Sequence, residues 1–356
     1  MKYISLFSGI EAASVAWEGL GWEPVCFAEL DEFPSAVLAY RYPEVPNVGD
    51  VTKAIWGKYK GRCDVVVGGS PCQSFSVAGK REGLRGESGL MYEYIRAVRD
   101  IRPAWFLWEN VPGALSSEGG EAFRQLLSEM DELGYGMAWR VLDAQFFGVA
   151  QRRRRVFLVG HLGACHPAEV LFEPESLRGN LESSAEKRAS LAKEAGRSPR
   201  SAGFKFHQGA GAGGVGAEPE QSPTLIADWH NPAVYPIDEP ITMTDLNANT
   251  AIGYDMVGTL KVGGEAPSVC PCGCAGEGKG ALVSEVVRRL TPRECERLQG
   301  FPDDWTRIPY RGRQAEECPD GPRYKAIGNS MAVPVMRWIG ERMDFVEGLE
   351  AEVRSE

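Results

Sequence analysis

The sequence lacks the features that mark membrane and secreted proteins. No apolar run approaches the roughly 20 residues that a membrane-spanning helix needs. Met1 and Lys2 lead directly into the strand pattern of residues 3–7, without the apolar stretch and cleavage site of a signal peptide. The nine cysteines are odd in number and mostly isolated, which argues against a disulfide framework. We therefore expect a cytoplasmic protein with no membrane partner.

The sequence also lacks the net positive charge expected of a nucleic-acid partner, since its formal charge is −10. The distribution of charge matters more than the total, because phosphate binding is local. Basic residues gather at 152–155 and again between Arg288 and Arg313, and acidic residues gather at 29–32 and in the C-terminal tail. An acidic shell around a basic cleft is compatible with DNA.

The hydrophobic pattern predicts an α/β fold. The chain has 356 residues, 43% of them hydrophobic, which is enough for one large domain and a smaller one. The first 160 residues alternate strand and helix patterns, as in a mostly parallel sheet covered on both faces. The expected strands are residues 3–7, 24–29, 65–68, 104–109, 139–142 and 156–160, and the expected helices are residues 10–20, 33–42, 90–102, 121–133, 291–299 and 331–343.

The middle of the chain differs in composition. Residues 176–223 are polar and rich in glycine, and we expect no regular structure there. Short strand-like pieces follow at 224–226 and 256–260, separated by Asn, Pro and Gly turns. We predict one domain from residues 1–165 and 322–356, and a loop-rich domain from residues 166–321.

The loop after the third expected strand carries a candidate nucleophile. Cys72 follows residues 65–68 at the carboxyl end of that strand, where open α/β sheets bind ligands. Pro71 restricts the residue before it to extended geometry and stiffens the loop. A cysteine presented in this way is typical of a nucleophile, although a small buried hydrophobic residue beside a turn fits the same pattern.

Three further segments lie at strand ends. Phe7-Ser8-Gly9 and Glu29 end the first two strands, where a nucleotide-like ligand meets backbone amides and a carboxylate, but many doubly wound folds share both features. Glu109 ends the fourth strand beside Trp108, where it donates a proton or caps a turn. Alternation sends Arg153 and Arg155 to one face, toward phosphate or a base oxygen, unless the run is only a solvated charge cluster.

Five motifs, in this order, resemble those of the DNA (cytosine-5) methyltransferases. They are Gly69-Ser70-Pro71-Cys72-Gln73-Ser74-Phe75-Ser76; Trp108-Glu109-Asn110-Val111; Gln151-Arg152-Arg153-Arg154-Arg155; Arg289-Leu290-Thr291-Pro292-Arg293-Glu294-Cys295 with Leu298-Gln299-Gly300-Phe301-Pro302; and Gly328-Asn329-Ser330. The resemblance covers residues 3–160 and 286–343. It implies the class I S-adenosylmethionine-dependent methyltransferase fold, a Rossmann-like, doubly wound, mostly parallel sheet, with residues 166–321 as a smaller, loop-rich target-recognition domain.

The resemblance also implies a mechanism on duplex DNA. The target cytosine is flipped out of the helix at a cost of a few kcal/mol. The Cys72 thiolate adds to carbon 6 of the base while Glu109 protonates or hydrogen-bonds nitrogen 3. Arg153 hydrogen-bonds the base oxygen, and Arg155 orients the nucleophile. The activated carbon 5 then accepts the methyl group of S-adenosylmethionine.

The implied cofactor contacts are spread over the whole matched region. They are Phe7, Ser8, Gly9, Glu29, Asp50, Pro71, Leu90, Asn329 and Met331. Two positions depart from the family pattern, since Glu11 stands in a loop that is usually richer in glycine and Ser5 stands where an acid is common. Glu11 either faces the ammonium group of the cofactor or points to solvent.

Other functions were weighed against this one. A non-catalytic DNA-binding homologue has no need of Cys72 and Glu109, and a nicotinamide oxidoreductase leaves both unexplained. An RNA cytosine methyltransferase shares the fold, but Gln73 after Cys72 favours DNA. Residues 270–274 hold three cysteines at one-residue spacing, which is atypical of zinc, so we expect no metal. We expect the protein to act on duplex DNA as a monomer.

Overall fold

The computed structural model describes residues 1–70, 89–163, 167–172 and 290–355, and between residues 201 and 289 it describes the backbone of short strands. Pro71, Cys72, the cysteines of residues 270–274 and the expected strands at 224–226 and 256–260 lie outside the described residues. Over the part that is described, no helix combines the length and apolar character needed to cross a membrane.

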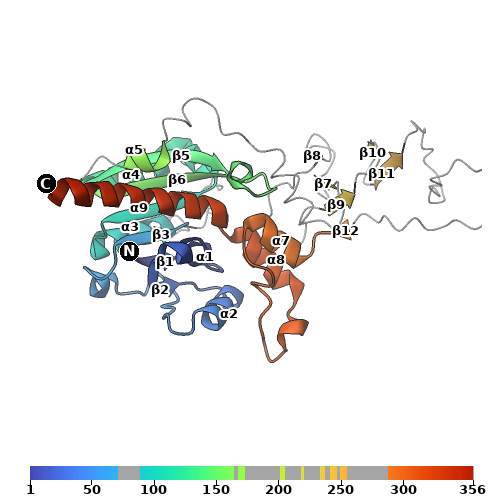
Figure 1. Cartoon of the computed structure of the whole chain (residues 1–356), viewed down its shortest axis with the longest axis horizontal. Coiled ribbons are helices and arrows are strands. Elements are labelled where there is room, and N and C mark those ends of the chain that lie inside the picture. The colour runs from blue at the N-terminus through green and yellow to red at the C-terminus, as the bar shows by residue number, and fades with distance from the viewer. Residues whose placement is uncertain are drawn as a thin grey trace, which may run out of the picture.

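Six strands of the described part form one mixed sheet (Figure 1). Its order is β2 (Glu23–Ala28), β1 (Lys2–Leu6), β3 (Val65–Gly68), β4 (Trp105–Asn110), β6 (Arg154–Leu162) and β5 (Tyr135–Asp143). The first four are parallel, and β6 runs antiparallel to both of its neighbours. The predicted Rossmann-like, mostly parallel sheet is confirmed. β5 and β6 are longer than predicted, because they pair with each other beyond the buried centre of the sheet.

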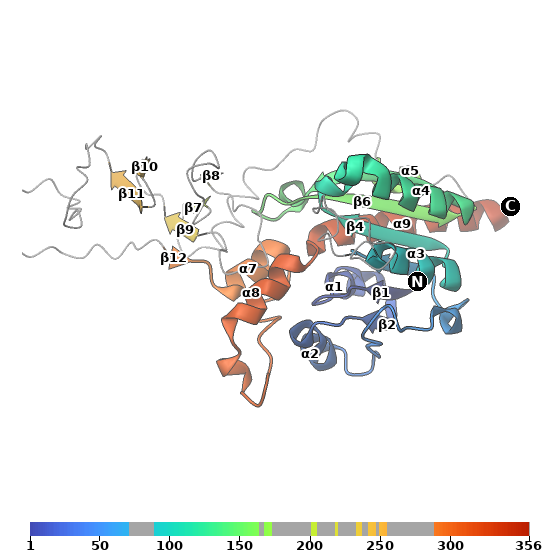
Figure 2. The ribbon, with the colours of Figure 1, turned by 180° about the vertical axis from the view of Figure 1, so that it is seen from behind.

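Strand alternation divides the core into two layers. Tyr3, Val65 and Trp105 pack in one cluster with helices α1 (Ala12–Trp17), α2 (Glu32–Arg41), α5 (Pro167–Leu171) and α9 (Val333–Ser355). Their neighbours in sequence, such as Ile4 and Val66, pack in a second cluster with α3 (Gly89–Ile101) and α4 (Glu121–Glu132). Helices therefore cover both faces of the sheet, as the reverse view shows (Figure 2).

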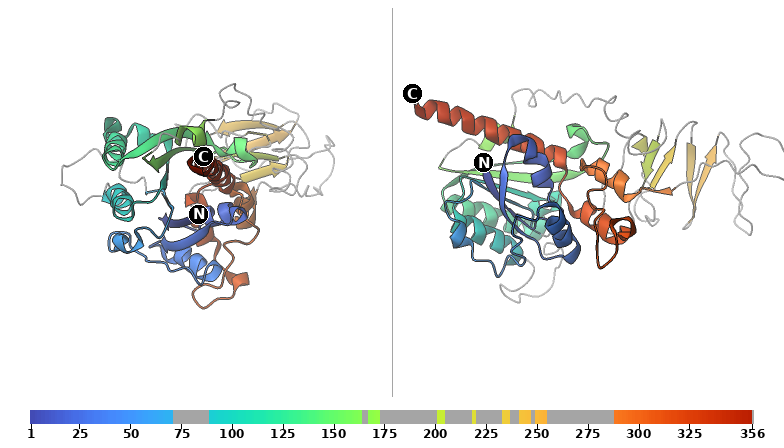
Figure 3. Two further views of the ribbon diagram at one scale, coloured as in Figure 1. Left: turned by 60° about the vertical axis from the view of Figure 1, so that its left-hand side comes forward. Right: turned by 60° about the horizontal axis from the view of Figure 1, so that its bottom comes forward.

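The long helix α9 brings the C-terminal part of the chain back against the N-terminal part. It lies beside α1 and α5 (Figure 3). The indole Nε1 of Trp17 in α1 donates to the carbonyl oxygen of Met336 at 2.8 Å. A Cβ atom at Gly340 of α9 would lie 2.3 Å from that same nitrogen, so only glycine permits the contact. The helix extends well past the predicted end at residue 343.

Two further helices precede α9. Helix α7 (Pro292–Gln299) lies where the sequence predicted a helix, and the structure shows that it begins with a capping box of Thr291 and Glu294. Helix α8 (Asp320–Asn329) was not predicted, because glycines interrupt its weak apolar pattern. The turn expected at residues 328–330 is the end of this helix. Buried side chains of this region, including Leu290 and Ile308, belong to the same core cluster as Tyr3.

The insert contains two small antiparallel sheets in its described part. One has the order β12 (Arg288–Arg289), β9 (Ala233–Pro236), β7 (Ser201–Phe204) and β8 (Glu218–Pro219), and the other pairs β10 (Ile241–Leu246) with β11 (Asn249–Tyr254). The expectation of no regular structure in residues 176–223 is wrong for β7 and β8. These strands are short and contain small residues and proline, so they carry little periodic signal. The described single-turn 3₁₀ segments are Glu18–Leu20, Trp56–Tyr59, Pro112–Leu115, Ser117–Gly120, Ala144–Phe147 and Ala315–Glu317.

Candidate active site

A cavity of about 1020 Å³ lies at the carboxyl edge of the parallel strands. Its walls come from the residues that follow β1, β2, β3 and β4, from the start of β6 and from the end of α8. The predicted site residues that line it are Phe7, Gly9, Glu29, Asp50, Leu90, Glu109, Arg153, Arg155 and Asn329. Ser8 and Met331 are not among its lining residues, and Pro71 and Cys72 lie outside the described residues. One cavity is therefore lined by most of the residues that the sequence assigned to catalysis or to cofactor binding.

The loop after β1 holds Glu29 at the cavity wall. The backbone N–H of Gly9 donates to one carboxylate oxygen of Glu29 at 2.7 Å, and the N–H of Asp31 donates to the other at 2.7 Å. Burial raises the pKa of Glu29, and these two hydrogen bonds oppose that shift. Ser8 does not line the cavity but links β1 to β2, since its hydroxyl donates to the Ser5 carbonyl and accepts from the Ala28 N–H.

Glu11 lies beneath the same loop and is buried. Its backbone is in the left-handed region at φ 66°, and its N–H donates to the Ser8 carbonyl at 3.0 Å. One carboxyl oxygen accepts from the N–H and the hydroxyl of Ser14, both at 3.1 Å. Burial raises the pKa of Glu11 from 4.5 to about 7, with a smaller contribution from Glu29. The side chain therefore faces neither solvent nor the cavity. The sequence suggested only solvent or the cofactor as its surroundings, and neither is found.

Two other lining residues differ in character. Asp50 accepts from the N–H and hydroxyl of Thr52 and pairs with Lys53 at 3.3 Å, and the Thr52 hydrogen bonds lower its pKa. Leu90, near the start of α3, contributes apolar surface. The aromatic ring of Phe7, the carboxyl groups of Glu29 and Asp50 and the apolar side chain of Leu90 therefore form a first group of lining residues.

The residues before Cys72 are fixed to the end of β4. The hydroxyl of Ser70 accepts from the indole of Trp108 at 3.3 Å, and its carbonyl accepts from the side-chain amide of Asn110 at 3.1 Å. A Cβ atom at Gly69 would lie 2.9 Å from a carboxylate oxygen of Glu109 and 3.0 Å from its carbonyl. A larger residue at this position would therefore force the Glu109 carboxylate or the adjacent backbone to shift.

Glu109 and the two arginines form a second group of lining residues. Nε of Arg155 lies 3.2 Å from Oε1 of Glu109, and both side chains are mostly buried. Arg153 is more deeply buried and donates to the carbonyl oxygens of Gly328 at 3.2 Å and Ser330 at 2.7 Å. Burial and the neighbouring Arg155 lower the pKa of Arg153 to about 9, so that its guanidinium remains charged at neutral pH. Alternation directs both arginines inward, as predicted.

Four charged residues on the cavity wall were missed by sequence reasoning. Lys325 of α8 pairs with Asp31 at 2.9 Å, and Arg311 pairs with Glu32. Both pairs join the start of α2 to the C-terminal segment, and all four side chains are more than half exposed. The partners are almost 300 residues apart along the chain, so that no local motif marks them.

Comparison with known proteins identifies a family of DNA methyltransferases. The model of the family described as C-5 cytosine-specific DNA methylase matches residues 1–344. The type II methyltransferase M2.BsuMI of Bacillus subtilis is 30% identical over an alignment that covers 100% of this chain and 78% of the relative. A protein of Escherichia phage P1 described as a DNA N-6-adenine-methyltransferase is 36% identical over 96% of this chain, which spans 61% of that relative's length.

Solved structures share the fold at low sequence identity. The S. pombe Dnmt2 methyltransferase has a TM-score of 0.62 and 14% identity, covering 97% of this chain and 99% of that chain. A putative DNA modification methyltransferase from an E. coli prophage has a TM-score of 0.55 and 18% identity, covering 98% and 99%. The class I methyltransferase fold expected from the sequence is thus confirmed.

Proposed function

Because the chain belongs to the C-5 cytosine-specific DNA methylase family, we propose that it transfers a methyl group from S-adenosylmethionine to carbon 5 of a cytosine flipped out of duplex DNA. The observation that carries this proposal is one cavity that is lined both by Phe7, Glu29 and Asp50, whose side chains suit a nucleoside, and by the Glu109–Arg155 pair. The segment that leads to Cys72 enters the same cavity at Gly69 and Ser70.

The first group of lining residues, Phe7, Glu29, Asp50 and Leu90, fits S-adenosylmethionine. The ring of Phe7 offers a surface for the adenine, and the carboxyl group of Glu29 offers acceptors for the ribose hydroxyls. Asp50 offers an acceptor for the adenine amino group, and Leu90 offers an apolar contact. When bound, S-adenosylmethionine supplies an electrophilic methyl group. Pro71 and Met331 are proposed to complete this site.

The second group of lining residues, Glu109, Arg153 and Arg155, fits a flipped-out cytosine. Cys72 is proposed to add to carbon 6 and so make carbon 5 nucleophilic, with Glu109 stabilising charge at nitrogen 3 through a proton or a hydrogen bond. After methyl transfer, loss of the carbon 5 proton to a base allows the Cys72 sulfur to leave. Arg155 contacts Glu109 directly, which supports a role for it in holding that carboxyl group against the base.

The central insert is proposed to read the DNA sequence. We propose residues 166–321, the range expected from the sequence, as the target-recognition domain, because arginine, asparagine, glutamine and lysine side chains on its loops suit readout of the major groove. Residues from 290 onward also pack in the catalytic core, so this end of the domain is tied to the catalytic sheet. We propose a monomer, because one chain supplies both groups of residues that line the cavity.

The direct test offers labelled S-adenosylmethionine with duplex DNA, single-stranded RNA or transfer RNA, and then maps the modified positions by sequencing. The proposal expects label in duplex DNA, at carbon 5 of cytosines within one short sequence. Label in RNA and never in DNA would reject the substrate. Label on adenine, as the printed name of the phage P1 relative allows, would reject the reaction.

A further inference from the structure

The end of α8 forms part of the cavity wall through its backbone. Gly328 and Asn329 both line the cavity. The last carbonyl groups of a helix have no partner within the helix, so donors from elsewhere must satisfy them. The donors that meet these carbonyls therefore fix the position of Asn329, and with it the shape of the proposed cofactor site.

Two buried side chains supply donors here, in addition to the backbone N–H of Ser330, which donates to the carbonyl of Ile327 at 3.2 Å. Arg153 donates to the carbonyls of Gly328 and Ser330, as described above. The side-chain amide of Gln299, the last residue of α7, donates to the carbonyl of Ile327 at 2.9 Å and to that of Ser330 at 3.3 Å. The carbonyl of Ser330 thus receives both side chains. Gln299 has no exposed surface, so it contacts these carbonyls from the interior of the protein.

We propose that Gln299 is a positioning residue for S-adenosylmethionine, which acts by holding the 327–330 turn and the side chain of Asn329 against the cofactor. This inference rests on the proposed function, since it assumes that the cavity binds that cofactor. Gln299 is not among the residues that line the cavity, so its effect passes through the backbone of the turn.

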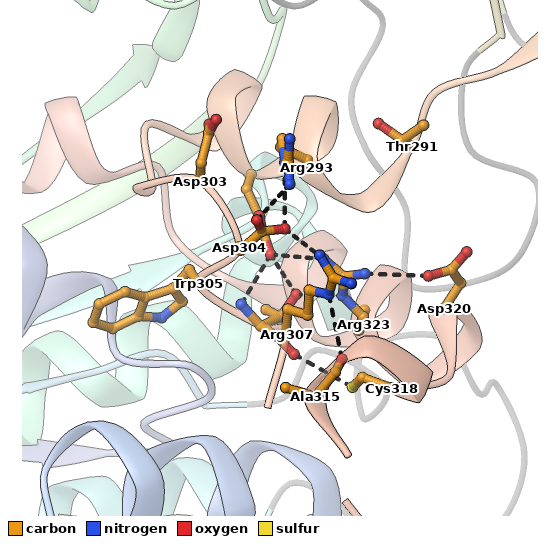
Figure 4. A network of polar contacts seen from close by, with 12 residues as sticks. Thr291, Arg293, Asp303, Asp304, Trp305, Arg307, Ala315, Cys318, Asp320 and Arg323 are labelled. Carbon is orange, nitrogen blue, oxygen red and sulfur yellow. Dashed lines mark hydrogen bonds and ion pairs between the residues drawn. The ribbon is translucent and has the colours of Figure 1, made fainter. Parts of the chain in front are cut away.

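Other contacts already hold α7 and α8 together, which separates positioning from folding. The hydroxyl of Tyr324 in α8 donates to the carbonyl of Leu290, just before α7, at 2.7 Å. Arg323 of α8 pairs with Glu296 of α7 and donates to Thr306 at 3.0 Å. Figure 4 shows the adjoining network, in which Arg293 and Arg323 both reach Asp304. The α7–α8 interface therefore survives the loss of the Gln299 amide.

The side-chain oxygen of Gln299 adds a second reason to expect a small effect on stability. This buried Oε1 atom has no hydrogen-bond partner in the described part of the chain. Leucine at this position removes two hydrogen bonds, but it also removes a buried acceptor that is costly when unpaired. The two effects oppose each other, so that the folded state should tolerate Gln299→Leu.

The test measures binding of S-adenosylmethionine by calorimetry, without DNA, for wild type, Gln299→Leu and the control Tyr324→Phe. The control removes one hydrogen bond from the same helix pair but leaves the 327–330 carbonyls untouched. We expect Gln299→Leu to raise the dissociation constant about tenfold, with a midpoint of thermal unfolding within about 3 °C of wild type. KM for the cofactor should rise in proportion, while kcat changes less than twofold. Tyr324→Phe should bind like wild type.

Several results would overturn the inference. One is wild-type affinity in Gln299→Leu, and another is equal weakening by Tyr324→Phe, which would assign the effect to the helix pair as a whole. If Gln299→Leu does not fold, Gln299→Met carries the same expectation, and failure of both to fold would show a purely structural role. A wild-type protein that binds no S-adenosylmethionine would reject the proposed function itself, which is a distinct result.

Discussion

Replacing Glu11 with glutamine should stabilise the protein above neutral pH and have little effect in acid. Glu11 is buried, and its second carboxyl oxygen has no hydrogen-bond partner within the described residues. Glutamine keeps the oxygen that accepts from Ser14 and removes the charge. The variant therefore isolates the cost of ionising this buried group.

The size and sign of the effect follow from the pKa of Glu11. A rise from 4.5 to about 7 means that the folded state holds this proton more tightly than the unfolded state. Its stabilising contribution is complete below pH 4.5 and is lost as pH rises through about 7. The full loss corresponds to about 3 kcal/mol. Wild type should therefore lose up to that amount relative to Glu11→Gln between pH 5 and about pH 8.

Denaturant titrations of both proteins across this pH range measure the difference in the free energy of unfolding. Glu18→Gln is the matched control, because Glu18 directly follows the same helix and is exposed. It should leave the pH dependence as in wild type. Parallel pH profiles for wild type and Glu11→Gln would refute the assignment of a buried, titrating carboxyl group at this position.

Three other substitutions test separate parts of the account. Gly69→Ala places a methyl group against Glu109, so kcat should fall more than tenfold with little change in the dissociation constant for S-adenosylmethionine; unchanged kcat would contradict this close approach. Arg155→Lys removes the guanidinium nitrogen that contacts Glu109 and should lower kcat while cofactor affinity, measured by calorimetry, stays constant; weaker cofactor binding instead would place Arg155 among the cofactor-binding residues. Gly340→Ala overlaps the Trp17 indole and should cost about 1–3 kcal/mol of stability in thermal unfolding, whereas a wild-type midpoint would mean that α9 shifts freely.

The sheet could be predicted from the sequence because its strands carry strong local signals. Val65-Val66-Val67 and the run before Glu109 are short apolar segments bounded by turns, and both are buried strands. Phe7, Glu29 and Glu109 follow from the same reasoning, since strand ends at one edge of a parallel sheet must lie together. Asp50, Leu90 and Asn329 were expected only from the family resemblance. The sequence likewise predicted a helix over residues 291–299, where α7 lies.

The remaining features depend on contacts that no local pattern records. The carbonyls that Arg153 meets lie 175 and 177 residues further along the chain. Helix α8 is stabilised by packing and by ion pairs of Arg323 rather than by its own sequence pattern. Glu11 could be recognised as a departure from the family pattern, but its burial depends on the surrounding fold.

The most direct test of the central claim is nucleoside analysis of duplex DNA treated with S-adenosylmethionine and either wild type or Cys72→Ser. Mass spectrometry of the digested DNA identifies which base has gained a methyl group, and calorimetry checks that both proteins bind the cofactor. The account predicts 5-methyl-2′-deoxycytidine from wild type and none above background from Cys72→Ser, with cofactor binding preserved. Persistent 5-methyl-2′-deoxycytidine from the serine variant, or methylation of adenine by wild type, would contradict it.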